Sequence, residues 1–168
     1  MNKSPAYSTL GAVAAWWGLL GTVVLLFFVV GRLYPFAAEM FAGELTALHW
    51  ALVVANVAFM AWSEGYRGFQ KSFSPRVAER AAALRCEVTP VRLLLAPFYV
   101  MGFFSAPRPV MLLIYGITVG VAVLVQIVRM LEQPWRGIVD AGVVVGLGWG
   151  AAATLIVGVR VLLADEDG

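Results

Sequence analysis

The chain has 168 residues, of which 61% are apolar and only 13% are charged. Proportions this far from those of soluble domains predict a protein that lies in a lipid bilayer. The formal net charge of +2 is too small to indicate nucleic-acid binding, and the single cysteine, Cys86, excludes a disulfide within the chain and a cysteine-rich metal site.

Four apolar segments are long enough to cross a membrane, since a helix needs roughly 20 residues to span a hydrocarbon core of about 30 Å. They cover residues 10–30, 45–62, 110–128 and 138–159. The second is the least apolar, because it contains His49 and Asn56. We therefore predict an all-α membrane protein in which residues 1–168 form one domain, a four-helix transmembrane bundle.

The basic residues fall unequally on the two sides that these spans define. One side has nine of them, Lys3, Arg67, Lys71, Arg76, Arg80, Arg85, Arg92, Arg108 and Arg160, and the other has three, Arg32, Arg129 and Arg136. Lys and Arg are retained in cytoplasmic loops, so this asymmetry predicts a multi-pass protein with both termini and the loop at residues 63–109 in the cytoplasm. Anionic lipid headgroups are then the expected partners of the basic loop.

Within this central loop, Ser74 and Pro75 are typical of a helix start, as N-cap and first helical residue. Apolar residues then fall on one helical face at Val77, Ala81, Leu84 and Val88. We predict an amphipathic helix on the inner leaflet between the second and third spans. The apolar run at residues 93–104 is too short to span, so an interfacial or re-entrant segment is expected, with a fifth crossing as the alternative.

Small residues recur every four positions along the fourth span. They are Gly142, Gly146, Gly150, Thr154 and Gly158, and the third span carries Gly116 and Gly120. Such GxxxG-like stripes let helix backbones approach closely in lipid, where the hydrophobic effect no longer drives association. The stripe is expected either to pack the four-helix bundle itself or to hold a second copy or a larger membrane complex.

His49, Asn56 and Ser63 are spaced by seven residues and therefore share one face of the second span. They form either a polar seam that holds this helix to its neighbours or part of a proton or ligand path. A single imidazole makes a poor metal or haem site, so no metal or cofactor is expected. At the start of the fourth span, Arg136 and Asp140 stand four apart and can pair as an anchor, with a carboxylate facing a cavity as the alternative.

The segment SEGYRGFQ is the densest in side chains capable of chemistry. It offers four candidate binding residues, Glu64, Tyr66, Arg67 and Gln70. They form either a structural clamp at the inner interface or a site for a lipid or substrate. The predicted topology places Glu64 and Asp140 at opposite faces of the bilayer, where they cannot act together as acid and base. Because no catalytic motif is present, no catalytic residue is predicted, and an enzyme would have to act on a lipid.

Three segments, SEGYRGFQ at 63–70, FSPRV at 73–77 and PWRGIVDAG at 134–142, resemble those of a family of small, uncharacterised bacterial membrane proteins. The similarity extends over about the last two thirds of the chain. The resemblance implies a bacterial inner-membrane protein, and it transfers no catalytic or binding residue.

These observations support three hypotheses on function. The first is an accessory or assembly subunit, or a homo-oligomer, that acts by helix association through the small-residue stripe. The second is a small permease or channel whose path is lined by the polar residues of the second and fourth spans. The third is a lipid-binding or lipid-modifying protein that uses Glu64, Tyr66 and Arg67 at the inner leaflet.

Overall fold

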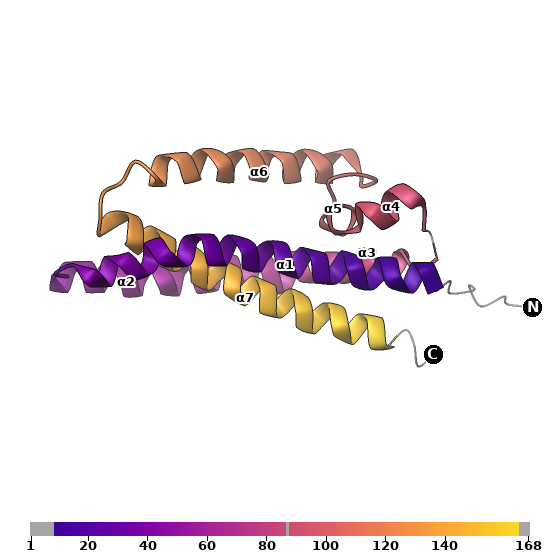
Figure 1. Cartoon of the computed structure of the whole chain (residues 1–168), viewed down its shortest axis with the longest axis horizontal. Coiled ribbons are helices and arrows are strands. Elements are labelled where there is room, and N and C mark those ends of the chain that lie inside the picture. Colours follow the sequence, from indigo (N-terminus) through magenta and orange to yellow (C-terminus); the bar gives the residue numbers. More distant parts are fainter. Residues whose placement is uncertain (1–8, 87, 165–168) are drawn as a thin grey trace, which may run out of the picture.

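The computed structural model describes residues 9–86 and 88–164, so Lys3 lies outside the described residues. Every regular element in these two ranges is helical, which confirms the all-α prediction. In chain order the elements are α1 (Thr9–Glu39), the 3-10 helix η1 (Met40–Ala42), α2 (Ala47–Met60), the π-helix η2 (Ala61–Phe73), α3 (Ser74–Ala83), α4 (Pro90–Leu94), α5 (Ala96–Met101), α6 (Arg108–Val128) and α7 (Trp135–Ala164) (Figure 1).

Three helical stretches are long and apolar enough to cross a membrane. They are α1 together with η1 (Thr9–Ala42), α6 and α7. Each contains one of the predicted spans and extends beyond it. The reason is that an apolar run indicates which part of a helix can contact lipid, whereas the ends of the helix are set by where its backbone hydrogen bonds stop.

The second predicted span, residues 45–62, is part of a much longer helix. α2, η2 and α3 follow one another without a break, so residues 63–83 are helical, although their polarity predicts a loop. The N–H of Ser74 donates to the carbonyl of Phe69, five residues back, which is the hydrogen-bond pattern of a π-helix. The helix continues because its exposed face carries Arg67, while Gly65 is buried against Trp149 of α7.

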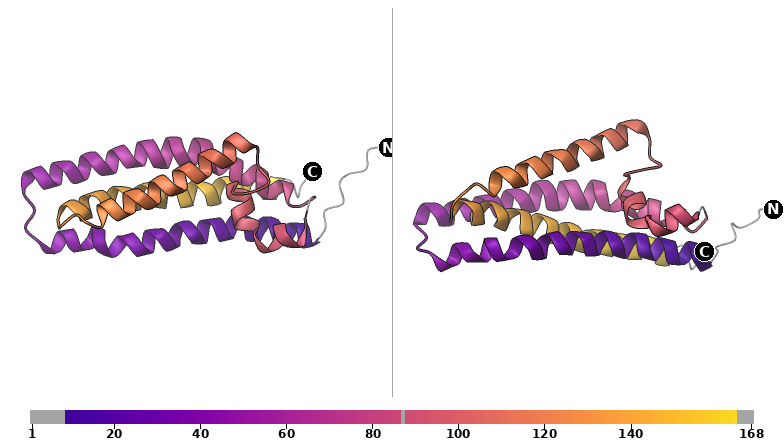
Figure 2. Two further views of the ribbon diagram at one scale, coloured as in Figure 1. Left: turned by 90° about the horizontal axis from the view of Figure 1, so that it is seen from above. Right: turned by 45° about the horizontal axis from the view of Figure 1, so that its top comes forward.

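α7 lies at the centre of the bundle. It packs along α1 on one side and along α2, η2 and α3 on the other (Figure 2). α3 therefore differs from the predicted surface helix: its residues Val77 and Ala81, together with Leu84 directly after the helix, are buried in the cluster formed with α1, α5 and α7. The hydroxyls of Ser74 and Thr154 also form a hydrogen bond of 2.9 Å in this buried contact.

The small-residue stripe of α7 packs against the same chain. Gly142 faces Asn56, Gly146 faces Glu64, Gly150 faces Phe69, Thr154 binds Ser74, and Gly158 faces Leu19. All five stripe residues are buried. Because α1, α2, η2 and α3 occupy the stripe, it offers no free surface to a second copy.

The short apolar run at residues 93–104 forms α4 and α5 and the turn that follows them. Both helices lie against α1, at the end of the molecule where α1 begins (Figure 1). α5 ends at Gly102, whose φ of 91° lies in the left-handed region that a residue without a Cβ adopts readily. With 5 and 6 residues, these helices are too short to cross a bilayer.

α6 stands away from the other helices (Figures 1 and 2). Of its residues only Val128, the last, is buried. Its first half is tied to the turn after α5 by a hydrogen bond of 2.6 Å from the Tyr115 hydroxyl to the carbonyl of Phe103. α6 is thus an apolar helix that the rest of the described chain leaves largely uncovered.

Candidate functional site in the cleft beneath α6

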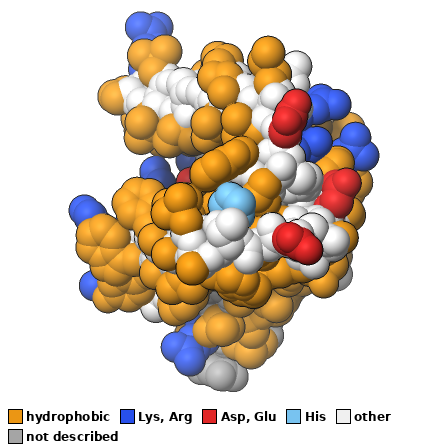
Figure 3. Space-filling model, turned by 90° about the vertical axis from the view of Figure 1, so that its left-hand side faces the viewer, with side chains coloured by type: hydrophobic (Ala, Val, Ile, Leu, Met, Phe, Trp, Pro, Cys, Tyr) orange, Lys and Arg blue, Asp and Glu red, His pale blue; other side chains and the backbone are white. Residues whose placement is uncertain are grey.

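Two cavities lie between α6 and the bundle. On α6 they are lined by apolar residues that recur every three or four positions, Val110, Leu113, Ile114, Ile117, Val121, Leu124, Val125 and Val128. This spacing corresponds to one face of the helix. When the left-hand side of Figure 1 faces the viewer, the space-filling surface has a hollow between the upper part of the molecule and the main body below it (Figure 3). We call the two cavities together the α6 cleft.

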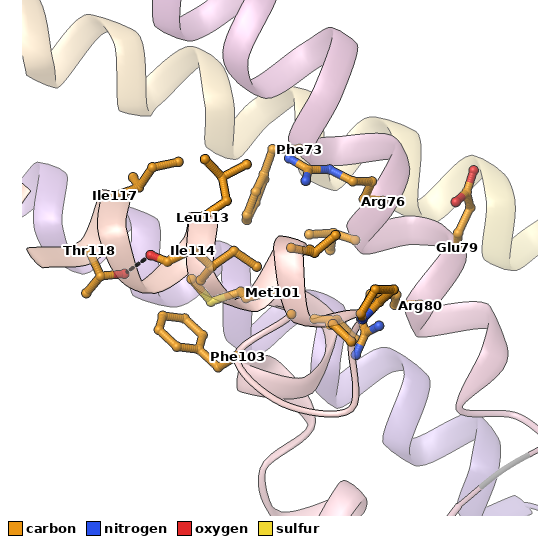
Figure 4. A pocket seen from close by; sticks show the side chains of 16 residues that line it. Phe73, Arg76, Glu79, Arg80, Met101, Phe103, Leu113, Ile114, Ile117 and Thr118 are labelled. Atoms are coloured by element: carbon orange, nitrogen blue, oxygen red, sulfur yellow. Dashed lines mark hydrogen bonds between the residues drawn. The ribbon is translucent and has the colours of Figure 1, made fainter. Parts of the chain in front are cut away.

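The larger cavity, of about 310 Å³, lies between α6 and the part of the bundle formed by α3 and α5. Its lining is mainly apolar, with Phe73 on one wall and Leu113 and Ile117 on the facing wall (Figure 4). Arg76 also lines this cavity. Its Nε and one Nη donate to the backbone and side-chain oxygens of Ser72, at 2.9 and 3.3 Å.

The smaller cavity, of about 140 Å³, brings together residues from two of the three sequence motifs. Glu64 comes from η2, and Arg136 and Asp140 come from the start of α7. Arg129, just after α6, completes the charged set. The rest of the lining is apolar and comes from α1, α2, α6 and α7. We call this the carboxylate cavity.

The carboxylate cavity corrects the prediction that Glu64 and Asp140 lie at opposite faces of the bilayer. That prediction ends the second helix at Trp62, whereas the helix continues to Ala83 and Glu64 lies near its middle, against Gly146 of α7. A helix rises about 1.5 Å per residue, so Gly146 and Asp140 are separated by about 9 Å along α7. The two carboxylates therefore line one cavity at different depths.

Asp140 is a buried carboxylate with a partner. Only 4% of the residue is exposed, and its Oδ2 lies 3.5 Å from Nε of Arg136, one helical turn earlier. The guanidinium carbon of Arg136 in turn lies 3.6 Å from the ring centroid of Phe36 in α1. The i, i+4 spacing thus produces the pair that it predicts, and a stacked cation neutralises Asp140 inside the protein.

Glu64 has no such partner. Its side chain is partly buried, and within the described ranges its carboxylate forms no hydrogen bond or ion pair. A methyl group at Gly146 would lie 3.3 Å from Glu64 Oε2, so the glycine provides the room that the carboxylate occupies. A charged group with apolar neighbours raises the free energy of the protein unless something pairs with it. Of the two carboxylates that line the cavity, Glu64 is therefore the one without an ion-pair partner among the described residues.

The other polar residues of the second helix are satisfied locally. His49 accepts a hydrogen bond of 3.2 Å from the backbone N–H of Thr46 and packs edge-on against Trp135. Asn56 donates to the carbonyl of Ile138 at 2.7 Å. Both therefore contact the start of α7, but neither lines a cavity beneath α6. His49 and Asn56, two of the polar residues that would line a permease path, thus hold the second helix against the start of α7.

The rest of the SEGYRGFQ motif lies outside the cleft. Arg67 stacks on Trp62, Lys71 stacks on Tyr66, and Gln70 accepts a hydrogen bond of 2.9 Å from Trp149. Among the four candidate binding residues of the motif, only Glu64 lines the carboxylate cavity. Sequence reasoning misses Arg129 and the inner face of α6, because α6 is apolar on all sides and its periodicity marks no preferred face.

In the part of the chain that the structure describes, no group of three or more His, Cys, Asp and Glu side chains could hold a metal ion. The described residues form an all-helical protein with three helices that could cross a membrane. One of them, α6, forms one wall of a mainly apolar cleft. No protein-family model matches the chain, and neither a curated protein nor a solved structure matches it. The resemblance to bacterial membrane proteins therefore stays a prediction.

Proposed function

We propose that the protein crosses a bacterial inner membrane four times and binds a membrane lipid in the α6 cleft. The fourth crossing is the continuous helix of α2, η2 and α3. This helix, α1, α6 and α7 all run between the same two ends of the molecule (Figure 1). The end with the start of α1 and the end of α7 also holds α3 to α5 and most of the arginines, which supports a cytoplasmic location for both termini.

The observation that carries the lipid proposal is the pair of apolar cavities on the inner face of α6. Water finds few hydrogen-bond partners in apolar space at bilayer depth, so lipid chains are the natural filling. Because most of α6 is exposed, a chain can reach the cleft directly from the surrounding bilayer. An acyl chain is therefore the expected occupant.

The charges around the larger cavity favour an anionic headgroup. Arg76 and Arg80 line this cavity against a single carboxylate, that of Glu79, so its charged lining is net positive. Arg76 is exposed and uses only part of its guanidinium on Ser72, which leaves N–H groups for a phosphate oxygen. Charge-assisted hydrogen bonds of this kind are typical of binding to anionic phospholipids.

A tryptophan at Ile117 should displace the bound lipid. Ile117 lines the larger cavity and is 57% exposed, so an indole ring there can fill the cavity without disturbing the bundle core. We expect Ile117→Trp to weaken lipid binding about tenfold, or about 1.4 kcal/mol. Val119 is 62% exposed and lines neither cavity, so Val119→Trp is the matched control and should bind like the wild type.

Lipid retention is measured by native mass spectrometry of protein released from nanodiscs that contain equal amounts of phosphatidylglycerol and phosphatidylcholine. The wild type and Val119→Trp should retain phosphatidylglycerol, and Ile117→Trp should lose it. Equal retention by the two tryptophan variants would contradict a lipid site in the cleft. Equal retention of the two lipids by the wild type would contradict the headgroup preference.

A second candidate function, association with another copy of the chain, is supported by the flank of α6. Gly116 and Gly120 line neither cavity, and a methyl group added at either would have no atom within 4 Å. Small residues at this spacing let a helix of a second copy approach closely in lipid, and an isologous contact gives a symmetric dimer. Because the stripe of α7 is occupied within the chain, α6 is the surface that supports this proposal.

Isoleucine at Gly116 or Gly120 should weaken such a dimer about tenfold without changing the stability of the monomer, because both positions face open space. Gly31→Ile on α1 is the control, since that glycine also has no atom within 4 Å of an added methyl group. Energy transfer between donor-labelled and acceptor-labelled copies in liposomes measures the association. A wild type without transfer, or variants with unchanged transfer, would refute a dimer through α6.

A further inference from the structure

Glu64 is a charged group that the lipid proposal leaves unused. It lines the carboxylate cavity from η2, and the facing wall is apolar, with Val121, Leu124 and Val125 of α6. Its carboxylate has no hydrogen-bond or ion-pair partner in residues 9–86 and 88–164. A ligand that brings the opposite charge would remove the free-energy cost of this isolated carboxylate.

The arginines that line the same cavity already have partners. Arg136 is paired with Asp140 and stacked on Phe36. Arg129 is exposed beyond the end of α6, and it donates to the side-chain oxygen of Gln126 at 3.3 Å. The two carboxylates and two arginines of this cavity balance formally, but the guanidinium of Arg129 is exposed to solvent. Glu64, which is partly buried, is then the charge inside the cavity without a counter-ion, so this position favours a cation over an anion.

The shape of the cleft indicates that this cation carries an apolar chain. The carboxylate cavity, of about 140 Å³, has room for a small headgroup but not for a long chain. Thr118 lines the larger cavity and Val121 lines the carboxylate cavity, one helical turn further along α6. A headgroup beside Glu64 can therefore extend a chain along the inner face of α6.

We propose that the carboxylate cavity binds the ammonium group of a cationic amphiphile, with Glu64 as its counter-ion and the chain beneath α6. The position of the chain rests on the proposed lipid site, whereas the charge selection rests on Glu64 alone. An ion pair enclosed by apolar walls is stronger than the same pair in water, provided that both charges find partners. Here the ammonium group of the ligand is the counter-ion of the Glu64 carboxylate, and the carboxylate is the counter-ion of the ammonium group.

Isothermal titration calorimetry on the protein in nanodiscs tests this assignment, with decyltrimethylammonium as the ligand. Decyl sulfate, which has the same chain and the opposite charge, is the comparison, and empty nanodiscs give the contribution of the bilayer. The wild type should bind the cation saturably, and Glu64→Gln should weaken binding at least about tenfold, because the amide keeps the shape and removes the charge. Glu44→Gln, at an exposed carboxylate that lines neither cavity of the α6 cleft, should bind like the wild type.

Three results would overturn the proposal: no saturable binding of the cation by the wild type, equal affinity of Glu64→Gln and the wild type, or decyl sulfate binding as tightly as the cation. Glu64→Gln should fold at least as well as the wild type, because it removes an unpaired charge, and its thermal unfolding transition verifies this. Leu124→Trp fills the same cavity from an exposed position of α6, so it provides a second variant with the same expected loss.

The two proposals can fail separately. Lost cation binding in Glu64→Gln with unchanged lipid retention in Ile117→Trp would refute the lipid site and keep the cation site. Unchanged cation binding in Glu64→Gln with lost lipid retention in Ile117→Trp would refute the cation site and keep the lipid site.

Discussion

Replacing Gly150 by alanine should lower the free energy of unfolding by about 1–3 kcal/mol, whereas the same replacement at Gly148 should leave it unchanged or raise it by up to about 1 kcal/mol. A methyl group at Gly150 would overlap Cγ of Phe69 and lie 2.7 Å from both Cδ atoms. These atoms are the ring atoms nearest to the backbone of Phe69, so they are the least able to move. The ring is also packed edge-on against Phe73, with 5.2 Å between the ring centroids. The ring therefore cannot move aside without disturbing η2.

Gly148 is the matched control for this prediction. It lies two residues before Gly150 in the same helix, and an added methyl group there would have no atom within 4 Å. Alanine is the better helix former at both positions, so the difference between the two variants isolates the clash with Phe69. Unfolding in mixed micelles, followed by circular dichroism, gives the two free energies. Equal values for both variants would show that η2 and α7 do not pack as closely as described.

The length of the second helix shows what apolar patterning can and cannot predict. The presence and approximate positions of α6 and α7 follow from their apolar runs, because each run is long enough to cross a bilayer. Patterning fails at residues 63–73, where polar side chains interrupt the run but the backbone stays helical. The contacts that matter there, Gly65 with Trp149 and Phe69 with Gly150, join residues far apart in sequence. No local pattern reports such contacts.

The two carboxylates of the cleft show that the same distinction, between local and long-range contacts, decides which parts of the candidate site can be predicted from sequence. The pairing of Asp140 with Arg136 is predictable, because both residues belong to one helix and stand one turn apart. The surroundings of Glu64 come from α1, α2, α6 and α7, so they depend on how the helices assemble. The cleft itself exists because α6 stands away from the bundle, and a uniformly apolar helix gives no sequence signal for that position.

Replacing Arg80 by methionine should destabilise the protein by about 2–3 kcal/mol, because the guanidinium of Arg80 connects α3 to the chain around α5. It donates to the carbonyl of Tyr99 at 2.8 Å, to that of Phe104 at 3.0 Å and to that of Ser105 at 3.3 Å. It also lies 4.2 Å from the ring centroid of Tyr99. Methionine keeps the apolar stem but leaves these carbonyls without the charged donor.

Arg76→Met is the control for the Arg80 prediction, because Arg76 lies one turn earlier in α3, is exposed, and binds Ser72 of the preceding turn. Its loss should change stability by no more than about 0.5 kcal/mol. Arg80→Lys should fall between the two, since an ammonium lacks the planar fork that reaches several carbonyls at once. Hydrogen exchange localises the effect: Arg80→Met should speed exchange at residues 96–106 and leave residues 47–73 unchanged. Unchanged exchange at 96–106 would mean that the packing of α5 on α1, and not Arg80, holds this segment in place.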